Sequence, residues 1–246
     1  MRYFIKFSYD GSNYYGYQKQ PRTKTIQGEL EKALKKINSN KAVNVVASGR
    51  TDAGVHAYNQ SAHFDLNKEI SPFKLKEALN GLIPSDIYIK SVSQVSDNFN
   101  ARFNVKAKEY VYKINTGEYN PIDKNYVFQY NKKLDVTEME RALKYLEGTH
   151  DFRSFVKIDE EKENYTRTII QTSLSRDIKN VNMITISILG TGFMRYMVRN
   201  IVGMLIEIGE GKHKSEDIIY VIEMKDRKKA GLCAPACGLY LKDVFY

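Results

Sequence analysis

Residues 49–57 form the segment whose residue types best suit chemistry. The segment reads GRTDAGVHA and places Arg50, Thr51 and Asp52 between two glycines, Gly49 and Gly54. It follows a predicted strand, and an exposed loop at a strand end is where proteins commonly place reactive groups. Glycine permits unusual backbone angles and a close approach of the backbone to a ligand. The reactive group would be the Asp52 carboxylate, although a tight turn in which Asp52 caps the next element explains the same residues.

Side chains that bind metals are sparse in the sequence. The two cysteines, Cys233 and Cys237, lie four residues apart, and no second pair completes a structural zinc site. The four histidines are widely separated and lack the spacing of an HExxH site. The sequence therefore implies no bound metal.

The charge balance favours a polyanionic partner. Lys and Arg number 38 against 29 Asp and Glu, which gives a net charge of +9. Cationic side chains release condensed counterions when they neutralise phosphates, so a nucleic acid suits such a surface. The 18 tyrosines and 11 phenylalanines could stack on unpaired bases, but β-strands favour the same residues. The charge alone does not decide between a protein that binds nucleic acid and an ordinary basic enzyme.

The elements that position this segment follow from hydrophobic periodicity in the first part of the chain. Alternation predicts strands over residues 2–9, 42–47 and 87–95, and another strand through Ala62, Phe64 and Leu66. A helical stripe from Ile26 to Ile37 predicts a helix with Thr25 as its N-cap. Ser71 and Pro72 open a second helix, which ends before Pro84.

The second part of the chain repeats this alternation of strands and helices. Strands are predicted over residues 108–114, 168–174, 183–189 and 239–245. Asp135 and Glu138 resemble a capping box, which predicts a helix that stops before Gly148. A long apolar helix is predicted over residues 193–208, and Ser215 is expected to cap the last helix. The class is α+β or α/β, with two similar halves joined near residue 105.

The sequence predicts a cytoplasmic protein without a membrane span. The apolar stretch 193–208 is interrupted by Arg195, Arg199 and Asn200, and it is shorter than the roughly 20 residues that cross a bilayer. The first ten residues, MRYFIKFSYD, contain no apolar core or cleavage site of a secretory leader. We therefore expect a buried helix and a cytoplasmic location.

The segment 49–57 closely resembles the catalytic motif of the TruA family of tRNA pseudouridine synthases. Other blocks resemble the same family and follow the family's order. They are YDGSNYYGYQKQPRTKTIQGELEKAL (9–34), NARFNVKAKEYVYKI (100–114), GTHDFRSF (148–155), RTI (167–169), GTGFMRYMVRNIVG (190–203) and APACGLYL (234–241). Together they cover essentially the whole chain, and a simple turn at Asp52 would need none of the distant blocks.

The resemblance implies that Asp52 is the nucleophile of an enzyme that isomerises uridine to pseudouridine. Carboxylates serve as nucleophiles at anomeric sugar carbons. The reaction detaches uracil from C1′ and rejoins it through C5, with no net oxidation and no second substrate, so no cofactor is implied. The sequence leaves open whether the carboxylate attacks the sugar, attacks the base ring, or abstracts a proton before a glycal forms.

By the same resemblance, Arg199 of the MVRN block pairs with Asp52. A nucleophilic carboxylate must stay ionised when base and sugar exclude water, and desolvation opposes ionisation. Coulomb attraction at about 4 Å supplies roughly 4 kcal/mol at an effective dielectric near 20, before desolvation is subtracted. A snorkelling side chain is the alternative for Arg199, but its place in an otherwise apolar helix favours a buried pair.

Tyr110 matches the family's active-site tyrosine, which stacks on the target uracil and helps to move the C5 proton. Tyr112 is the rival, because side chains two residues apart in a strand point the same way, and either could be a plain core aromatic. Arg50 is expected to contact phosphate or to help flip the base, with a loop salt bridge as the alternative. Thr51 and His56 complete the predicted substrate-binding set with Arg50 and Tyr110.

The resemblance also implies a fold and partners. The fold is α+β, with two similar ferredoxin-like halves that share a long, mixed, mostly antiparallel sheet and a central basic cleft. The N-terminal half, 1–105, would carry Asp52, and the C-terminal half, 106–246, would carry Tyr110 and Arg199. Family members act as homodimers on the anticodon stem-loop of tRNA, at positions 38 to 40, where one uridine is flipped at a cost of a few kcal/mol.

Two residues depart from the family pattern. Ser48 stands where alanine or glycine is commoner, and Lys108 stands where arginine is common. Lysine keeps the charge but loses the bidentate fork for phosphate, so the departure concerns RNA placement. Two other functions fit parts of the pattern: a non-catalytic RNA chaperone with the same fold, and a synthase that acts on another RNA or on other tRNA positions.

Overall fold

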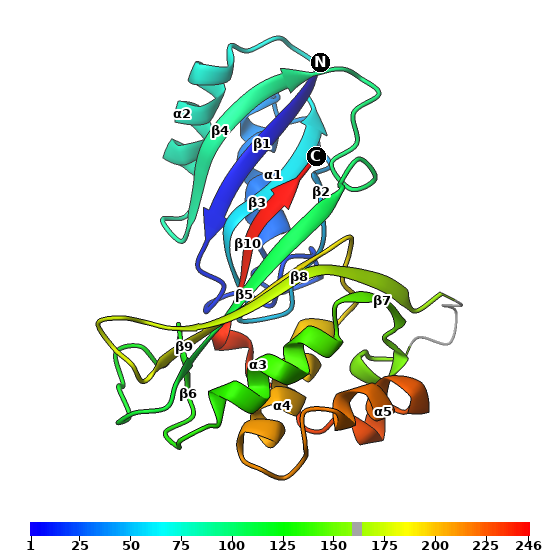
Figure 1. Cartoon of the computed structure of the whole chain (residues 1–246). Helices are drawn as coiled ribbons and strands as arrows, with labels where there is room; N and C mark the ends of the chain where they lie inside the picture. Colours follow the sequence, from blue (N-terminus) through cyan, green and yellow to red (C-terminus); the bar gives the residue numbers. More distant parts are fainter. Residues whose placement is uncertain (159–163) are drawn as a thin grey trace. The chain divides into compact units, whose positions relative to one another are not determined.

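The chain folds into two units, and the computed structural model describes residues 1–158 and 164–246. Unit 1 comprises Met1–Lys106 and Tyr240–Tyr246, and unit 2 comprises Ala107–Leu239 (Figure 1). The end of the chain returns to unit 1, because its last strand pairs with a strand of that unit. The division predicted from the sequence, 1–105 and 106–246, differs from this because it places the final residues in the C-terminal half.

Unit 1 contains a sheet in which β4, β1, β3 and β10 lie side by side in that order. β1 is antiparallel to both β3 and β4, and β10 runs parallel to β3. The short strand β2 also pairs with β3. The elements of unit 1 are β1 (Arg2–Tyr9), α1 (Ile26–Ile37), β2 (Val46–Ala47), β3 (His56–Asp65), α2 (Pro72–Leu82), β4 (Ile87–Val95) and β10 (Leu239–Phe245).

The core of unit 1 follows from the alternation in β1. Tyr3, Ile5, Phe7 and Tyr9 are buried, whereas the residues between them are partly exposed. Because side chains alternate across a strand, one face of the sheet is apolar. The buried stripes of α1 and α2 complete this core, and Figure 1 shows α1 behind the sheet.

Unit 2 contains an antiparallel sheet with the strand order β5, β9, β8 and β7. The short strand β6 runs parallel to β5. The longer elements of unit 2 are β5 (Ala107–Asn115), β6 (Phe128–Gln129), α3 (Val136–Tyr145), β7 (Gly148–Asp151), β8 (Thr166–Arg176), β9 (Met183–Gly190), α4 (Met197–Gly209) and α5 (Asp217–Met224). Each unit thus combines a sheet with helices, and the predicted α+β class is confirmed.

Three of the four predicted helix caps are confirmed. The side-chain oxygens of Thr25, Ser71 and Asp135 each accept a backbone N–H from the first turn of the following helix. The prediction for Ser215 was wrong. α5 begins after Glu216, and the Ser215 hydroxyl lies 3.2 Å from a carboxylate oxygen of Glu216 instead of capping the helix.

The apolar helix α4 is shorter than predicted. It begins at Met197 rather than at residue 193, because Tyr196 has a left-handed backbone conformation (φ 66°) that interrupts the helix. Most residues of α4 are buried, as expected for a core helix. Within the described residues, the length and apolarity needed to cross a bilayer do not coincide in any helix.

The strand before the candidate site is also shorter than predicted. Only Val46–Ala47 of the predicted strand 42–47 is paired, with His63 and Ala62 of β3. The chain therefore enters the segment 49–57 directly from a two-residue strand, and β3 begins inside that segment at His56.

Candidate active site

The segment 49–57 consists of the loop of unit 1 that leads from β2 to β3 and the first two residues of β3. Arg50 is exposed, Thr51 is buried with 9% of its surface accessible, and Asp52 is half-buried. The loop thus presents the guanidinium of Arg50 and the carboxylate of Asp52, with the buried Thr51 between them. Such an arrangement is able to hold a reactive carboxylate in a fixed place.

The residue before Asp52 is held by the last residue of β1 and by the segment that follows β1. The Tyr17 N–H donates to the Thr51 carbonyl (3.1 Å), and the hydroxyls of Tyr9 and Thr51 lie 2.8 Å apart. Burial raises the pKa of Tyr9 to about 12, so its hydroxyl remains protonated near neutral pH. Thr51 is therefore fixed through both its backbone and its side chain.

Gly16 allows these two segments to meet. Its backbone is left-handed (φ 87°), and a Cβ added to it would lie 2.9 Å from the Thr51 carbonyl oxygen. The same Cβ would lie 3.2 Å from the carbonyl carbon of Asp52. Gly16 is thus required both by conformation and by space.

Asp52 opens a tight turn, which is one part of the alternative interpretation of the sequence. The Val55 N–H donates to the Asp52 carbonyl (3.2 Å), and Gly54 has a φ of 77° at the third position of the turn. This bond uses the backbone of Asp52, so the turn itself does not require a carboxylate at that position.

A buried glutamine holds the start of the loop, although no sequence motif indicated it. The Ser48 hydroxyl donates to Gln60 Oε1 (2.6 Å), and Gln60 Nε2 donates to the Gly49 carbonyl (3.1 Å). Gln60 is fully buried in β3. The serine that departs from the family pattern therefore has a specific partner here.

His56 lies in the core of unit 1, with 2% of its surface accessible. Its Nδ1 accepts the Gly11 N–H (3.1 Å) and lies 3.2 Å from Asp10 Oδ1. Its ring stacks on Tyr240 with 4.7 Å between the centroids. These contacts give the imidazole a packing role in unit 1, and its assignment to substrate binding stays a prediction.

Tyr110 and Tyr112 of β5 have different surroundings within unit 2. Tyr110 retains 8% of its surface and packs edge-to-face against Phe193, with 5.1 Å between the ring centroids. Tyr112 is fully buried, and its hydroxyl donates to the Pro235 carbonyl (2.7 Å). The contacts of Tyr112 are therefore those of a core residue, which favours Tyr110 as the aromatic that meets a substrate.

Arg199 lies in the first turn of α4 and is half-buried. Its Nε donates to the Ala234 carbonyl (2.7 Å), and its guanidinium carbon lies 5.2 Å from the ring centroid of Tyr196. The neighbouring Asn200 is buried, and its side chain donates to the Phe155 carbonyl (2.7 Å). Arg199 thus has a defined orientation within unit 2 rather than that of a solvated surface cation.

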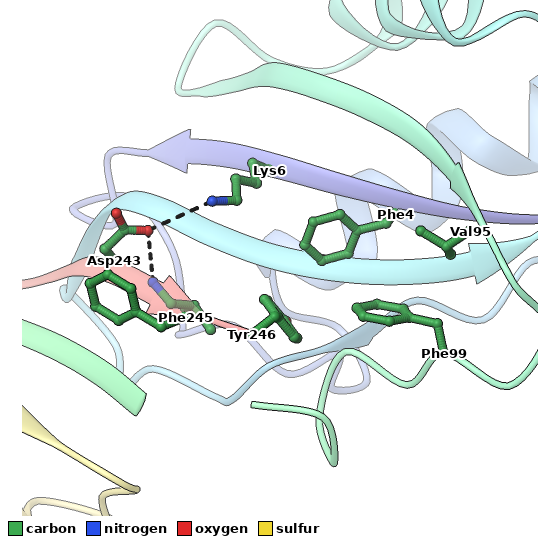
Figure 2. A pocket seen from close by; sticks show the side chains of 8 residues that line it. Phe4, Lys6, Val95, Phe99, Asp243, Phe245 and Tyr246 are labelled. Atoms are coloured by element: carbon green, nitrogen blue, oxygen red, sulfur yellow. Dashed lines mark hydrogen bonds and ion pairs between the residues drawn. The ribbon is translucent and has the colours of Figure 1, made fainter. Parts of the chain in front are cut away.

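A groove of about 450 Å³ lies elsewhere in unit 1 (Figure 2). Phe4 lies edge-to-face with Phe99 and with Tyr246, and Lys6 pairs with Asp243 at 4.0 Å. The full lining consists of Phe4, Lys6, Val95, Phe99, Asp243, Val244, Phe245 and Tyr246. None of the predicted site residues lines this groove, so we assign it no part in the chemistry.

Sequence comparison indicates a family for the whole chain. A family model described as tRNA pseudouridine synthase matches residues 6–104 and 142–246. The tRNA pseudouridine synthase A of Geobacillus sp. (strain WCH70) is 44% identical over 240 residues, which cover 97% of this chain and 96% of that protein. The tRNA pseudouridine synthase A of Anoxybacillus flavithermus is 43% identical over 97% of this chain and 96% of its own length.

A third relative extends over the entire chain. The tRNA pseudouridine synthase A of Thermosipho melanesiensis is 43% identical over 246 residues, which cover 100% of this chain and 99% of that protein. Among solved structures, a chain of a Cbf5-Nop10-Gar1 complex matches with 11% identity and a TM-score of 0.36, over 83% of this chain and 54% of that chain. That likeness is too weak to indicate a shared fold.

Proposed function

This chain belongs to the tRNA pseudouridine synthase family, and we propose that it isomerises uridine to pseudouridine in the anticodon stem-loop of tRNA, at positions 38, 39 and 40. The observation that carries the proposal is the half-buried Asp52 on a loop that is fixed from both sides within unit 1. A nucleophile needs such a fixed placement, because misplacement by about 1 Å can cost a hundredfold in rate.

Asp52 is the proposed nucleophile. The bond between N1 of uracil and C1′ breaks, the bond between C5 and C1′ forms, the C5 proton leaves, and N1 gains a proton. Atoms and electrons balance without an oxidant or a second substrate. The carboxylate supplies covalent catalysis, which divides one difficult step into two easier ones.

Arg199 is the proposed cation that keeps the nucleophile ionised. A guanidinium favours the charged form of a nearby carboxylate when water is excluded. The bond from Nε to Ala234 and the Tyr196 ring define the orientation of the guanidinium within unit 2. This defined orientation supports a role in catalysis, since electrostatic stabilisation works best when the charge is placed in advance.

Tyr110 is proposed to stack on the target uracil and to assist the transfer of the C5 proton. Its residual exposure and its contact with Phe193 are consistent with an aromatic surface that receives a base. Arg50, which is exposed, is proposed to contact the RNA backbone. Thr51 and His56 would then act mainly by holding the loop, through the Tyr9 and Gly11 bonds described above.

The partners proposed for the enzyme follow from the same family membership. The substrate is tRNA, for which a net charge of +9 is favourable. We propose a homodimer in the cytoplasm, with a basic cleft that receives the stem-loop. The reaction itself calls for no cofactor.

The test is the release of tritium from tRNA that carries [5-³H]uridine. Wild-type protein should release tritium, and Asp52→Asn should release none while it keeps the wild-type melting temperature and affinity for tRNA. Asp97→Asn, at an exposed aspartate of unit 1, is the matched control and should behave as wild type. Turnover in Asp52→Asn would reject Asp52 as nucleophile, and an unaltered uridine content with wild-type protein would favour an RNA chaperone.

A further inference from the structure

One side of α4 carries a second segment of unit 2. Arg199, Gly203 and Glu207 are spaced by four residues and therefore form one stripe along the helix. Residues 231–234, at the start of segment 231–238, lie against this stripe. The Leu232 N–H lies 3.4 Å from Glu207 Oε1, at the far end of the stripe from Arg199.

Gly203 permits this close approach. A Cβ added to it would lie 1.6 Å from the Leu232 carbonyl oxygen and 2.7 Å from its carbonyl carbon. Real Cβ atoms do not approach backbone atoms so closely, and backbone cannot move aside as a flexible side chain can. The start of segment 231–238 is therefore packed directly on the backbone of α4.

Arg199 makes two reciprocal bonds with this segment. The Ala234 N–H donates to the Arg199 carbonyl (3.0 Å), and Arg199 Nε donates to the Ala234 carbonyl (2.7 Å). The second bond fixes the plane of the guanidinium, because Nε lies in that plane. Ala234 thus contributes, together with the Tyr196 ring, to the orientation of the Arg199 guanidinium.

Tyr112 holds the residue that follows Ala234. Its hydroxyl donates to the Pro235 carbonyl (2.7 Å), and its ring is fully buried. A Cβ on Gly238 would lie 2.7 Å from the Tyr112 ring, so the ring also packs on the end of the segment. Burial raises the pKa of Tyr112 well above its usual value, and the hydroxyl therefore remains a donor.

We propose that Tyr112 is a positioning residue for catalysis, which fixes segment 231–238 through Pro235 and thereby orients the guanidinium of Arg199. The inference rests on the proposed function, since it takes Arg199 as the cation of the site. Tyr112 itself does not touch the substrate. Its contribution passes through one backbone segment to one side chain, all within unit 2.

The first test is Tyr112→Phe, which removes the hydroxyl and keeps the ring. We expect kcat for tRNA to fall about tenfold, because a misplaced charge loses transition-state stabilisation. KM should stay within about twofold, since the interaction serves the transition state more than substrate binding. The matched control is Tyr3→Phe, which deletes another buried tyrosine hydroxyl that donates to a backbone carbonyl, that of Ile70 (2.9 Å). Tyr3→Phe should lose stability but keep the wild-type kcat.

The second test asks whether the effect passes through Arg199. In the Arg199→Lys background the Nε donor is absent, so Tyr112→Phe should lower kcat by less than about twofold. An equal loss in both backgrounds, or a wild-type kcat in Tyr112→Phe, would overturn the inference. If Tyr112→Phe does not fold, Ala234→Gly is the substitute variant. It should lower kcat and leave KM unchanged, because it loosens the backbone that orients Arg199. A wild-type kcat in Ala234→Gly would then overturn the inference.

The outcomes separate this inference from the proposed function. If Arg199→Lys is impaired and Tyr112→Phe is not, the positioning role fails and the proposed role of Arg199 stands. If Arg199→Lys keeps the wild-type kcat, the proposed role of Arg199 fails, and the positioning role fails with it.

Discussion

The hydroxyl of Tyr9 lies 2.8 Å from the hydroxyl of Thr51, in the interior of unit 1 and one residue before Asp52. The last residue of β1 thereby holds the loop that carries the proposed nucleophile. The bond joins residues 42 positions apart, so its formation depends on the tertiary structure.

Tyr9→Phe should loosen the loop without abolishing folding. The variant leaves the Thr51 hydroxyl without this buried partner, which costs about 1 kcal/mol of stability. We expect a lower kcat with little change in KM for tRNA, because the nucleophile becomes less well placed. Steady-state kinetics and thermal melts measure both effects. In Tyr3→Phe, by contrast, the stability should fall while kcat does not; equal kcat values in the two variants would show that the bond has no catalytic effect.

Gly16→Ala should be more damaging than Tyr9→Phe. The added Cβ would strain a left-handed residue and approach the Thr51 carbonyl oxygen to 2.9 Å. We expect a loss of about 1–2 kcal/mol and a fall in kcat, as measured by urea unfolding and tritium release. Gly81→Ala is the control, because nothing lies within 4 Å of its added Cβ in α2. That change should be neutral or stabilising by up to about 1 kcal/mol, and a similar loss at both glycines would contradict the role of Gly16.

The stability of the protein should fall in alkaline solution because Tyr9 is buried. Its pKa rises from 10.0 to about 12 in the folded state. Between these values the unfolded chain releases the proton and the folded chain keeps it, so the free energy of unfolding falls as pH rises from 10 towards 12. The share of Tyr9 is on the order of 2–3 kcal/mol. Urea unfolding at pH 9, 10 and 11 should show a shallower decline for Tyr9→Phe than for wild type, and identical slopes would contradict the assignment.

The sequence predicted those parts of the fold that depend on local pattern. The alternation over residues 2–9, 87–95 and 239–245 matches β1, β4 and β10. A half-buried strand shows such alternation because every second side chain faces the core. The helix caps at Thr25, Ser71 and Asp135 are equally local. The start of α4 was not predictable, because the left-handed Tyr196 carries no signal in an apolar run.

The candidate site divides in the same way. The loop of Asp52 was evident from one continuous motif, whereas its support depends on residues that are distant in sequence. Ser48 meets Gln60 across 12 positions, and Tyr112 meets Pro235 across 123. Only the folded chain brings such pairs together, and a buried glutamine or tyrosine in a strand looks like ordinary core until its partner is known.

This chain is proposed to make pseudouridine in the anticodon stem-loop of tRNA through Asp52. The most direct measurement maps pseudouridine in tRNA from cells that lack the gene and from the same cells complemented with wild type, Asp52→Asn or Asp97→Asn. Pseudouridine at positions 38, 39 and 40 should be absent without the gene, return with wild type and Asp97→Asn, and stay absent with Asp52→Asn. Its persistence without the gene, or its return with Asp52→Asn, would contradict the claim.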